Sequence, residues 1–357
     1  MIQAQKGFQI MASASRKRSG KFSIYRADAL EWLAQRAPQS IHAVVTDPPY
    51  GLLEYSPKEI AKLRSGRGGV WRIPPSADGV KRRPLPRFTV LTDGDKASLQ
   101  SFFERFARVL LPTMVPGAHV FIATNPLVSH LAYCPMIAAG FEPRGEIIRI
   151  VHRLRGGDRP KNAHKEFKDV TVLPKSCWEP WGLFRRPCEG RVQDNLRKWG
   201  TGGLRRISDA EPFRDLIYSQ PTRRSEHRLA PHPSLKPQHF LRQLVRASLP
   251  MKKGIVLDPF MGSGSTLAAA EFWGLQSIGI EADPEYFEMA KKAVPALAGL
   301  EIPEVQAFGS SKAGASGSGR THVFGVKEPI KRLSACQVDR RGDVRLLRGK
   351  PIQVDDK

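Results

Sequence analysis

Cysteine is scarce in this sequence, and its spacing suits neither a metal site nor a disulfide framework. The four cysteines among 357 residues stand at positions 134, 177, 188 and 336, without any C-x-x-C pattern. Structural zinc sites need closely spaced cysteines, and disulfide-stapled secreted domains need a dense set of them. The sequence therefore argues against both kinds of protein and fits a reducing compartment such as the cytoplasm.

Long apolar runs and acidic residues are also in short supply. No run approaches the roughly 20 apolar residues of a membrane-spanning helix, and no apolar segment of a secretory signal follows the basic N-terminus. Asp and Glu number 34 against 57 Lys and Arg, which leaves a formal net charge of +23. We expect no membrane partner and a polyanionic one, most simply nucleic acid. The alternative is a basic protein without such a partner.

The rest of the sequence alternates strand-like and helix-like segments. Strands are expected at residues 22–25, 41–45, 118–123 and 147–151, and helices at residues 28–33, 99–111, 126–139 and 238–249. Two further strands, at residues 170–173 and 181–184, would extend the same sheet. This alternation predicts an α/β fold with a mostly parallel, mixed sheet and helices on both faces.

One segment, residues 255–281 (IVLDPFMGSGSTLAAAEFWGLQSIGIE), reads as strand, glycine loop, helix, strand and acid. Ser265 and Thr266 are the expected N-caps of a helix that continues from residue 267 to residue 272. Glycines let the backbone approach a nucleotide-like ligand, and an acid that ends the next strand, here Glu281, can hold ribose hydroxyls. The spacing departs from G-x-G-x-x-G and includes no Walker lysine, so neither a dinucleotide site nor a P-loop is indicated.

A second motif, TDPPYG at residues 46–51, directly follows a predicted strand. Its two prolines fix φ and stiffen the turn, which would present the Asp47 carboxylate, the Pro48 carbonyl and the Tyr50 ring at the carboxyl end of the sheet. The two oxygens can accept the hydrogens of an exocyclic amine, which favours its more nucleophilic, tetrahedral form. The ring can stack on a base swung out of a duplex. A proline-rich turn with a solvated aspartate is the alternative.

Two long segments differ in composition from the rest. Residues 52–90 combine Lys and Arg with glycines, prolines and Trp71, which suits either a flap that faces nucleic acid or a solvated, disordered insertion. Residues 152–230 are rich in arginine, with tryptophans interspersed. Within them, residues 193–207 (QDNLRKWGTGGLRRI) are the best candidate for a base-reading element, unless these charges are solvated and the tryptophans lie in the core.

Four motifs together resemble one enzyme family. They are Asp28 in segment 25–33, VVTDPPYG at residues 44–51, HPSLKP at residues 232–237, and the glycine loop with GIEADPEY in residues 258–286. Their order resembles that of the β-order class of bacterial DNA amino-methyltransferases, in which D-P-P-Y precedes the recognition region and the S-adenosylmethionine motif comes last. The resemblance covers most of residues 22–294 and implies a Rossmann-like, S-adenosylmethionine-dependent methyltransferase fold. Ala27, where relatives often have glycine, and the long insertion after Tyr50 depart from the family pattern.

The resemblance implies roles for individual residues. Asp47 and Pro48 would position and activate the target amine, and Tyr50 would stack on the flipped base; with Pro49 they form the expected catalytic set. The cofactor would be S-adenosyl-L-methionine, with its ribose hydroxyls on Glu281. The expected cofactor-binding residues are Asp28, Asp47, Lys236, Asp258, Pro259, Phe260, Gly262, Ser263, Gly264, Glu281 and Asp283.

The resemblance also implies a reaction. Aspartate at the start of D-P-P-Y looks like adenine-N6 enzymes and serine like cytosine-N4 enzymes, so we expect direct methyl transfer to adenine N6 in duplex DNA, with base flipping and without a metal. The alternatives are a cytosine-N4 or RNA methyltransferase and a catalytically inactive DNA-binding relative. The expected setting is the bacterial cytoplasm, as a monomer or homodimer, with a cognate restriction endonuclease as a candidate partner.

The predicted organisation has six parts. A disordered tail (1–20) precedes the catalytic half of the methyltransferase domain (21–151, with the insertion 52–90). A DNA target-recognition region (152–230) and the S-adenosylmethionine-binding half (231–296) follow. The chain then continues as a flexible linker (297–320) and a basic appendage (321–357).

Overall fold

The structure is a computed structural model that describes residues 16–19, 21–49, 91–151, 159–160, 162–232, 234–302, 336–338 and 344–346. The chain divides into two compact units, residues 1–308 and residues 309–357. The boundary falls within the segment predicted as a linker, residues 297–320. The smaller unit contributes two antiparallel strands, β10 (Cys336–Val338) and β11 (Val344–Leu346). The predicted insertion, residues 52–90, lies outside the described residues.

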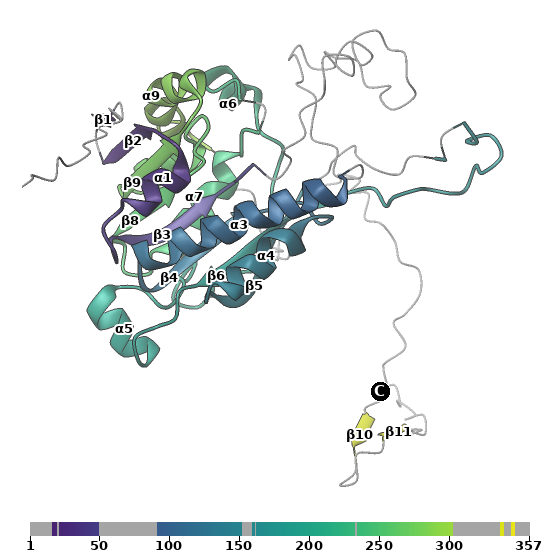
Figure 1. Cartoon of the computed structure of the whole chain (residues 1–357), viewed down its shortest axis with the longest axis horizontal. Coiled ribbons are helices and arrows are strands. Elements are labelled where there is room, and N and C mark those ends of the chain that lie inside the picture. Colours follow the sequence, from purple (N-terminus) through teal and green to yellow (C-terminus); the bar gives the residue numbers. More distant parts are fainter. Residues whose placement is uncertain are drawn as a thin grey trace, which may run out of the picture. The chain divides into compact units, whose positions relative to one another are not determined.

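A nine-stranded sheet forms the centre of the larger unit, in the order β1-β2-β9-β8-β3-β4-β6-β5-β7 (Figure 1). Strand β6 is antiparallel to β4 and β5, and β1 is antiparallel to β2, whereas the other neighbouring strands are parallel. The prediction of a mostly parallel, mixed sheet is confirmed. The strands are β1 (Arg16–Ser19), β2 (Phe22–Arg26), β3 (Ile41–Thr46), β4 (Met114–Ala123), β5 (Glu142–Ile150), β6 (Trp178–Arg185), β7 (Leu216–Tyr218), β8 (Ile255–Asp258) and β9 (Gln276–Glu281).

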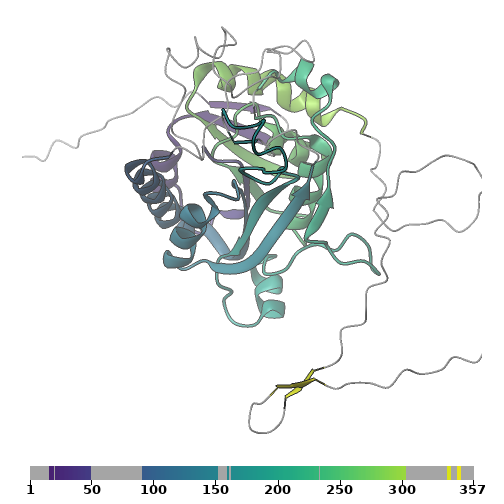
Figure 2. The same ribbon diagram turned by 90° about the vertical axis from the view of Figure 1, so that its right-hand side faces the viewer.

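Helices cover both faces of this sheet (Figure 2). Successive side chains of β3 point to opposite faces: Val44 packs in the core with α1, α3 and α4, whereas Ala43 and Val45 pack in the core with α7 and α8. Both cores are built from fully buried aliphatic and aromatic side chains, so the sheet is an interior layer. The helices are α1 (Ala29–Ala34), α3 (Asp93–Thr113), α4 (Ser129–Ala138), α5 (Val192–Trp199), α6 (Arg224–Leu229), α7 (Gln238–Ser248), α8 (Ser265–Phe272) and α9 (Pro284–Ala298).

Several predicted boundaries differ from the structure. Helix α3 begins six residues before the predicted residue 99, because Thr92 and Asp95 form a capping box there. Helix α8 begins at Ser265 with Gly264 as its N-cap, so neither Ser265 nor Thr266 caps it. Strand β1 forms within the predicted disordered tail, by pairing with β2.

The predicted strand at residues 170–173 is wrong. These residues form no strand, and the side chains of Val170 and Val172 are 47% and 62% exposed. They belong to the connection between β5 and β6, which projects from the sheet in Figure 1. A run of β-branched residues makes a strand only where a neighbouring strand is free to pair with it.

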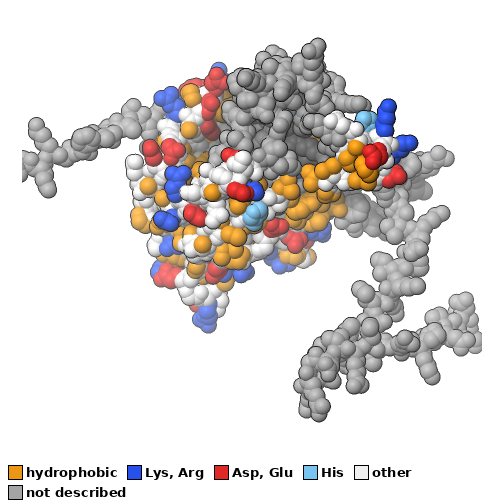
Figure 3. Space-filling view, turned by 45° about the vertical axis from the view of Figure 1, so that its right-hand side comes forward, with side chains coloured by type: hydrophobic (Ala, Val, Ile, Leu, Met, Phe, Trp, Pro, Cys, Tyr) orange, Lys and Arg blue, Asp and Glu red, His pale blue; other side chains and the backbone are white. Residues whose placement is uncertain are grey.

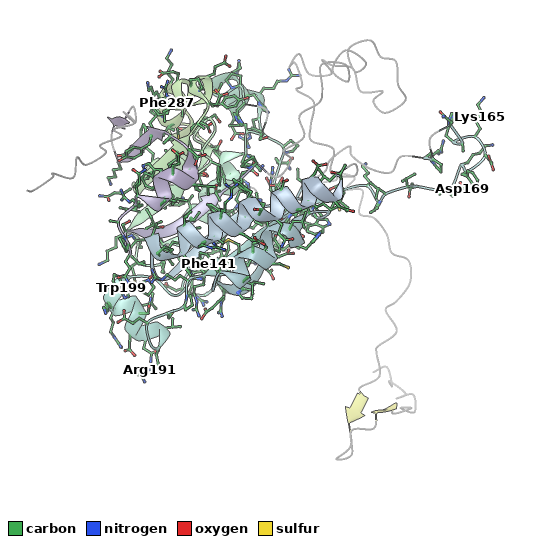
Figure 4. All side chains as sticks on the ribbon, in the orientation of Figure 1. Phe141, Lys165, Asp169, Arg191, Trp199 and Phe287 are labelled. Carbon is green, nitrogen blue, oxygen red and sulfur yellow. The ribbon has the colours of Figure 1, made fainter. Side chains whose placement is uncertain are left out.

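Strand direction assigns the connections to the two edges of the sheet. The parallel strands β2, β3, β4, β5, β7, β8 and β9 all end at one edge, here named the carboxyl edge. The β5–β6 connection starts and ends there, because β6 runs in the opposite direction. Helix α5 follows β6 and therefore lies at the other edge; Figure 4 shows Arg191 and Trp199 far from Lys165 and Asp169. Among the described helices, none is long and apolar enough to cross a membrane.

Candidate active site

The two central strands bring the predicted motifs together. Strands β3 and β8 are parallel neighbours, with Ala43 opposite Val256 and Val44 opposite Leu257. The D-P-P-Y turn leaves β3 directly after Thr46, and the glycine loop leaves β8 directly after Asp258. The hydroxyl of Thr46 donates a hydrogen bond of 2.7 Å to Oδ1 of Asp258. Ligands of open α/β sheets bind beyond the carboxyl ends of the strands, and both motifs lie there.

Asp258 is a buried carboxyl group, 4% exposed. Besides Thr46, the backbone N–H of Phe260 donates to its Oδ1, over 3.2 Å. Burial raises the pKa of Asp258 to about 7, because water no longer stabilises the carboxylate, and the nearby charge of Asp47 acts in the same direction. Its position under the glycine loop makes Asp258 a residue that ties the loop to the sheet.

Left-handed backbone at two glycines shapes the loop. Gly262 has φ 51° and Gly264 has φ 84°, a region that side-chain-bearing residues rarely adopt. A Cβ on Gly264 would also lie 2.4 Å from Cγ2 of Val294 in α9. The Gly264 N–H donates to the carbonyl of Met261 over 2.7 Å, which closes the turn. The loop thus needs glycine for its path and for its close contact with α9.

Glu281 ends β9 and faces this loop. Its two carboxylate oxygens accept N–H groups from Gly262, at 2.9 Å, and from Asp283, at 2.8 Å. Each oxygen keeps further acceptor capacity, so the carboxylate can take two hydroxyl groups of a ribose. Partial burial raises the pKa of Glu281, an effect opposed by the backbone N–H donors. The glycine loop and Glu281, which the sequence linked to one ligand, are thus joined by a direct hydrogen bond.

Asp47 forms an ion pair that the sequence did not reveal. The Nζ of Lys236, in the HPSLKP segment, donates to Oδ2 of Asp47. Both side chains are largely buried, with 11% of Lys236 and 17% of Asp47 exposed. Pro48 is buried and Pro49 is exposed, and Tyr50 lies outside the described residues. Lys236 was predicted to line the cofactor pocket; the structure brings it to Asp47.

The remaining predicted cofactor residues fall into two groups. Phe260 packs by its ring against Phe102 and Phe106 at centroid distances of 5.8 and 5.4 Å, and stays half-buried beside the buried Pro259 and Ser263. Asp28 and Asp283 are exposed N-caps instead. Asp28 accepts from the first turn of α1 and Asp283 from the first turn of α9. Their positions beside the ends of β2 and β9 keep both near Glu281.

Three residues of the site were missed by sequence reasoning. The ring of His232 lies 4.3 Å from that of Tyr286, and a Cβ on Gly262 would be 2.9 Å from its Nε2, so His232 packs directly against the glycine loop. Glu179 and Arg149 form a buried pair, 3.2 Å apart, next to Lys236. The HPSLKP motif was the signal for His232, and a charge inside the apolar run 147–151 was the signal for Arg149. Among the described residues, no cluster of His, Cys, Asp or Glu is suited to a metal ion.

The predicted base-reading element, residues 193–207, does not join this site. Asn195 of α5 donates to the carbonyl of Pro116, at the start of β4, over 3.0 Å, and Thr201 does so over 2.6 Å. These buried contacts fix the segment at the edge of the sheet opposite to Asp47. Structural hydrogen bonds thus account for the polar side chains of Asn195 and Thr201. The structure does not support residues 193–207 as a base-reading element at this site.

Comparisons with known proteins agree with the motifs. Residues 145–292 match the family model N6_N4_Mtase, described as DNA methylase. The type II methyltransferase M2.LlaDCHI of Lactococcus lactis subsp. cremoris is 34% identical over 89 residues, which cover 25% of this chain and 33% of that protein. The match thus spans about a third of that relative's length. The type II methyltransferase M.HindIII of Haemophilus influenzae is 24% identical over 292 residues, 75% of this chain and 93% of that protein.

A solved structure supports the fold. The cytosine-N4-specific PvuII DNA methyltransferase matches with a TM-score of 0.50 and 17% identity, over 80% of this chain and 89% of that one. The predicted methyltransferase-like α/β fold is confirmed. The motifs, their order and these matches support a DNA amino-methyltransferase similar to the family that contains adenine-N6 and cytosine-N4 enzymes.

Proposed function

We propose that this protein transfers a methyl group from S-adenosylmethionine to the exocyclic amine of a base flipped out of duplex DNA, and that the base is adenine. One observation carries the proposal: Asp47 and the glycine loop leave adjacent parallel strands at the same edge of the sheet. An amine held by Asp47 would therefore face a cofactor held by the loop and Glu281. The choice of adenine N6 rests on the aspartate that opens D-P-P-Y.

The chemistry needs few groups from the protein. S-adenosylmethionine, which the glycine loop and Glu281 would hold, would supply an electrophilic methyl group. The lone pair of the amine nitrogen would form the new bond to the methyl carbon as the carbon–sulfur bond breaks, and the sulfonium would become a neutral thioether. The new N-methyl group is complete when the nitrogen loses one proton to solvent. Asp47 and the Pro48 carbonyl would orient the two amine hydrogens, so that the lone pair points at the methyl group. Rate enhancement would come from in-line orientation and exclusion of water.

The proposal also assigns DNA contacts to the carboxyl edge. The described part of the β5–β6 connection, residues 159–160 and 162–177, projects from this edge and carries the exposed basic side chains of Lys165, Lys168 and Lys175. Figure 3 shows hydrophobic side chains along this projecting segment and charged ones towards its end. It lies within residues 152–230, which we propose to contain the target-recognition region. It connects the end of β5 to the start of β6, both at the carboxyl edge, which supports the proposal that it meets DNA near Asp47.

The direct test is expression in a bacterial host that lacks DNA methylation, followed by digestion of genomic DNA and nucleoside mass spectrometry. N6-methyladenine is the expected product. N4-methylcytosine would keep the mechanism and overturn the base assignment. The absence of both marks, with soluble protein present, would refute the proposed activity on DNA. Sequencing that detects modified bases would then give the recognition site, and a restriction–modification setting would be tested by a search for a nuclease blocked at that site.

A further inference from the structure

A row of four alternating charges runs from the active site into the sheet. It starts at Asp47 and continues through Lys236 and Glu179 to Arg149. The Nζ of Lys236, on Oδ2 of Asp47, lies 3.9 Å from Oε1 of Glu179. The side chains of Glu179 and Arg149 are 5% and 4% exposed. Lys236 therefore stands between the partly buried carboxylate of Asp47, to which it is bonded, and the buried carboxylate of Glu179, to which it is close.

Glu179 is held in one orientation by two hydrogen bonds, one to each carboxylate oxygen. It is the cross-strand partner of Arg149 in the β5–β6 ladder, and its Oε2 accepts from Nη1 of Arg149 at 3.2 Å. Its Oε1 accepts from the indole N–H of Trp181 at 2.8 Å. Arg149 in turn donates from Nε to the hydroxyl of Ser219 at 3.1 Å. A buried carboxylate is costly unless its partners are fixed, and here Oε1, which accepts from Trp181, also lies 3.9 Å from the Nζ of Lys236.

The ion pair at Asp47 conflicts with the proposed reaction. Asp47 must accept a hydrogen from the target amine, but the ammonium of Lys236 already donates to it. Positive charge also moves from the sulfonium to the amine nitrogen during transfer, and a cation beside that nitrogen opposes the change. Lys236 must therefore leave Asp47 when the base enters.

We propose that Lys236 occupies the place of the target amine on Asp47 in the empty enzyme, and that Glu179 receives Lys236 when the base arrives. This inference rests on the proposed function. A charge-assisted hydrogen bond is about 2.8 Å long, so a shift of about 1 Å brings Nζ from its present distance onto Oε1. Lys236 stays paired with a carboxylate in both positions. Its ammonium balances the charge of Asp47 until the base takes its place. Glu179 and Lys236 are thus positioning residues that act through Asp47.

The test is a double-mutant cycle of Glu179→Gln and Lys236→Met, read by single-turnover methyl transfer to duplex DNA at saturating cofactor. In Glu179→Gln the receiving charge is gone and Lys236 remains on Asp47, so we expect a rate about 10- to 100-fold lower, with cofactor affinity by calorimetry unchanged within about twofold. The double variant also lacks the competing ammonium, so its rate should be at least about fivefold higher than that of Glu179→Gln. A wild-type rate in Glu179→Gln, or a double variant slower than Glu179→Gln, would overturn the proposal.

Two further variants keep the result interpretable. Arg149→Met/Glu179→Met removes both buried charges together, which avoids a lone buried arginine, and it should show the same loss of rate with normal thermal melting. Glu189→Gln is the matched control, because Glu189 pairs with Lys198 at 2.7 Å beside α5, at the opposite edge; its rate should stay within about twofold. If the wild type itself transfers no methyl group, the proposed function fails. If it does and both Glu179 variants match it, only this inference fails.

Discussion

The hydroxyl group of Thr46 donates a 2.7 Å hydrogen bond to the carboxyl group of Asp258, although the two residues are 212 positions apart in the sequence. The bond joins the last residue of β3 to the last residue of β8, and therefore the start of the D-P-P-Y turn to the start of the glycine loop. A shift of either strand along the other would break it. One buried hydrogen bond thus fixes the position of the D-P-P-Y turn relative to the glycine loop along the strand direction.

The buried carboxyl of this contact predicts a pH-dependent stability. The pKa of Asp258 is about 7 in the folded protein against 3.8 as the ordinary value. Its contribution to folding stability is therefore fully present below about pH 4 and is lost as the pH rises through about 7. Asp258→Asn keeps an oxygen for Thr46 and Phe260 and carries no charge. We expect the variant to be more stable than wild type by on the order of 2–4 kcal/mol at about pH 8 and equally stable at about pH 4.

Chemical unfolding of the cofactor-free protein at several pH values measures this difference. Asp169→Asn, at an exposed position of the projecting segment, is the control and should match wild type throughout. A constant difference between Asp258→Asn and wild type over the whole pH range would contradict an ionisable buried group at this position.

The role of Asp47 predicts a separation of binding and chemistry. Asp47→Ala removes the acceptor of the target amine and leaves the loop and Glu281 intact, so methyl transfer should fall by at least about 10²–10³-fold while cofactor affinity stays within a few-fold. Single-turnover transfer and calorimetric titration of the cofactor on the same preparation measure the two quantities. An equal loss of cofactor affinity would show that Asp47 belongs to the cofactor site and not to the base.

Replacement of Glu281 should have the opposite effect and weaken cofactor binding. Glu281→Gln weakens the acceptor for the ribose hydroxyls, and we expect about a tenfold loss of cofactor affinity at about pH 8, the size of one charge-assisted hydrogen bond. Because burial raises the pKa of Glu281, the wild type takes up a proton at a higher pH than an ordinary glutamate does. Its cofactor affinity should therefore fall as the pH is lowered, whereas that of Glu281→Gln should stay flat. Parallel pH dependences in calorimetry would rule out Glu281 as the titrating group.

The sequence predicted the parts of the site that are local in the chain. Strand, glycine loop, helix, strand and acid form one continuous unit, so the contact between Gly262 and Glu281 follows from chain connectivity. The contact between Asp47 and Lys236 does not, because it depends on the order of strands and on a segment 189 residues away. The family resemblance supplied this proximity in outline but not the ion pair.

The predictions that the structure does not support also depended on the long-range arrangement of strands, which local composition does not specify. Residues 170–173 have the composition of a strand but no neighbouring strand to pair with. Residues 193–207 have the composition of a DNA-binding segment, but composition does not say at which edge of a sheet a segment lies. The reversed direction of β6 decides that. Glu179 was overlooked because a single acid carries no pattern, and the charge of Arg149 inside an apolar run did not show its partner; only the cross-strand pairing joins the two.

The same topology yields a prediction about DNA binding that separates the two edges. Lys165→Glu/Lys168→Glu places two acids on the projecting segment of the carboxyl edge, and Arg191→Glu/Arg197→Glu makes the same charge change on α5 at the other edge. Each phosphate contact contributes about 0.9 to the slope of log affinity against log salt. The lysine variant should bind duplex DNA more weakly and lose about two from the magnitude of that slope, and the α5 variant should keep both values.

Fluorescence anisotropy with labelled duplex over a salt series measures the affinity and the slope. A loss confined to the α5 variant would place DNA at the edge opposite to Asp47 and would contradict the proposed DNA-binding surface, since a base flipped out there could not reach the amine-binding carboxylate.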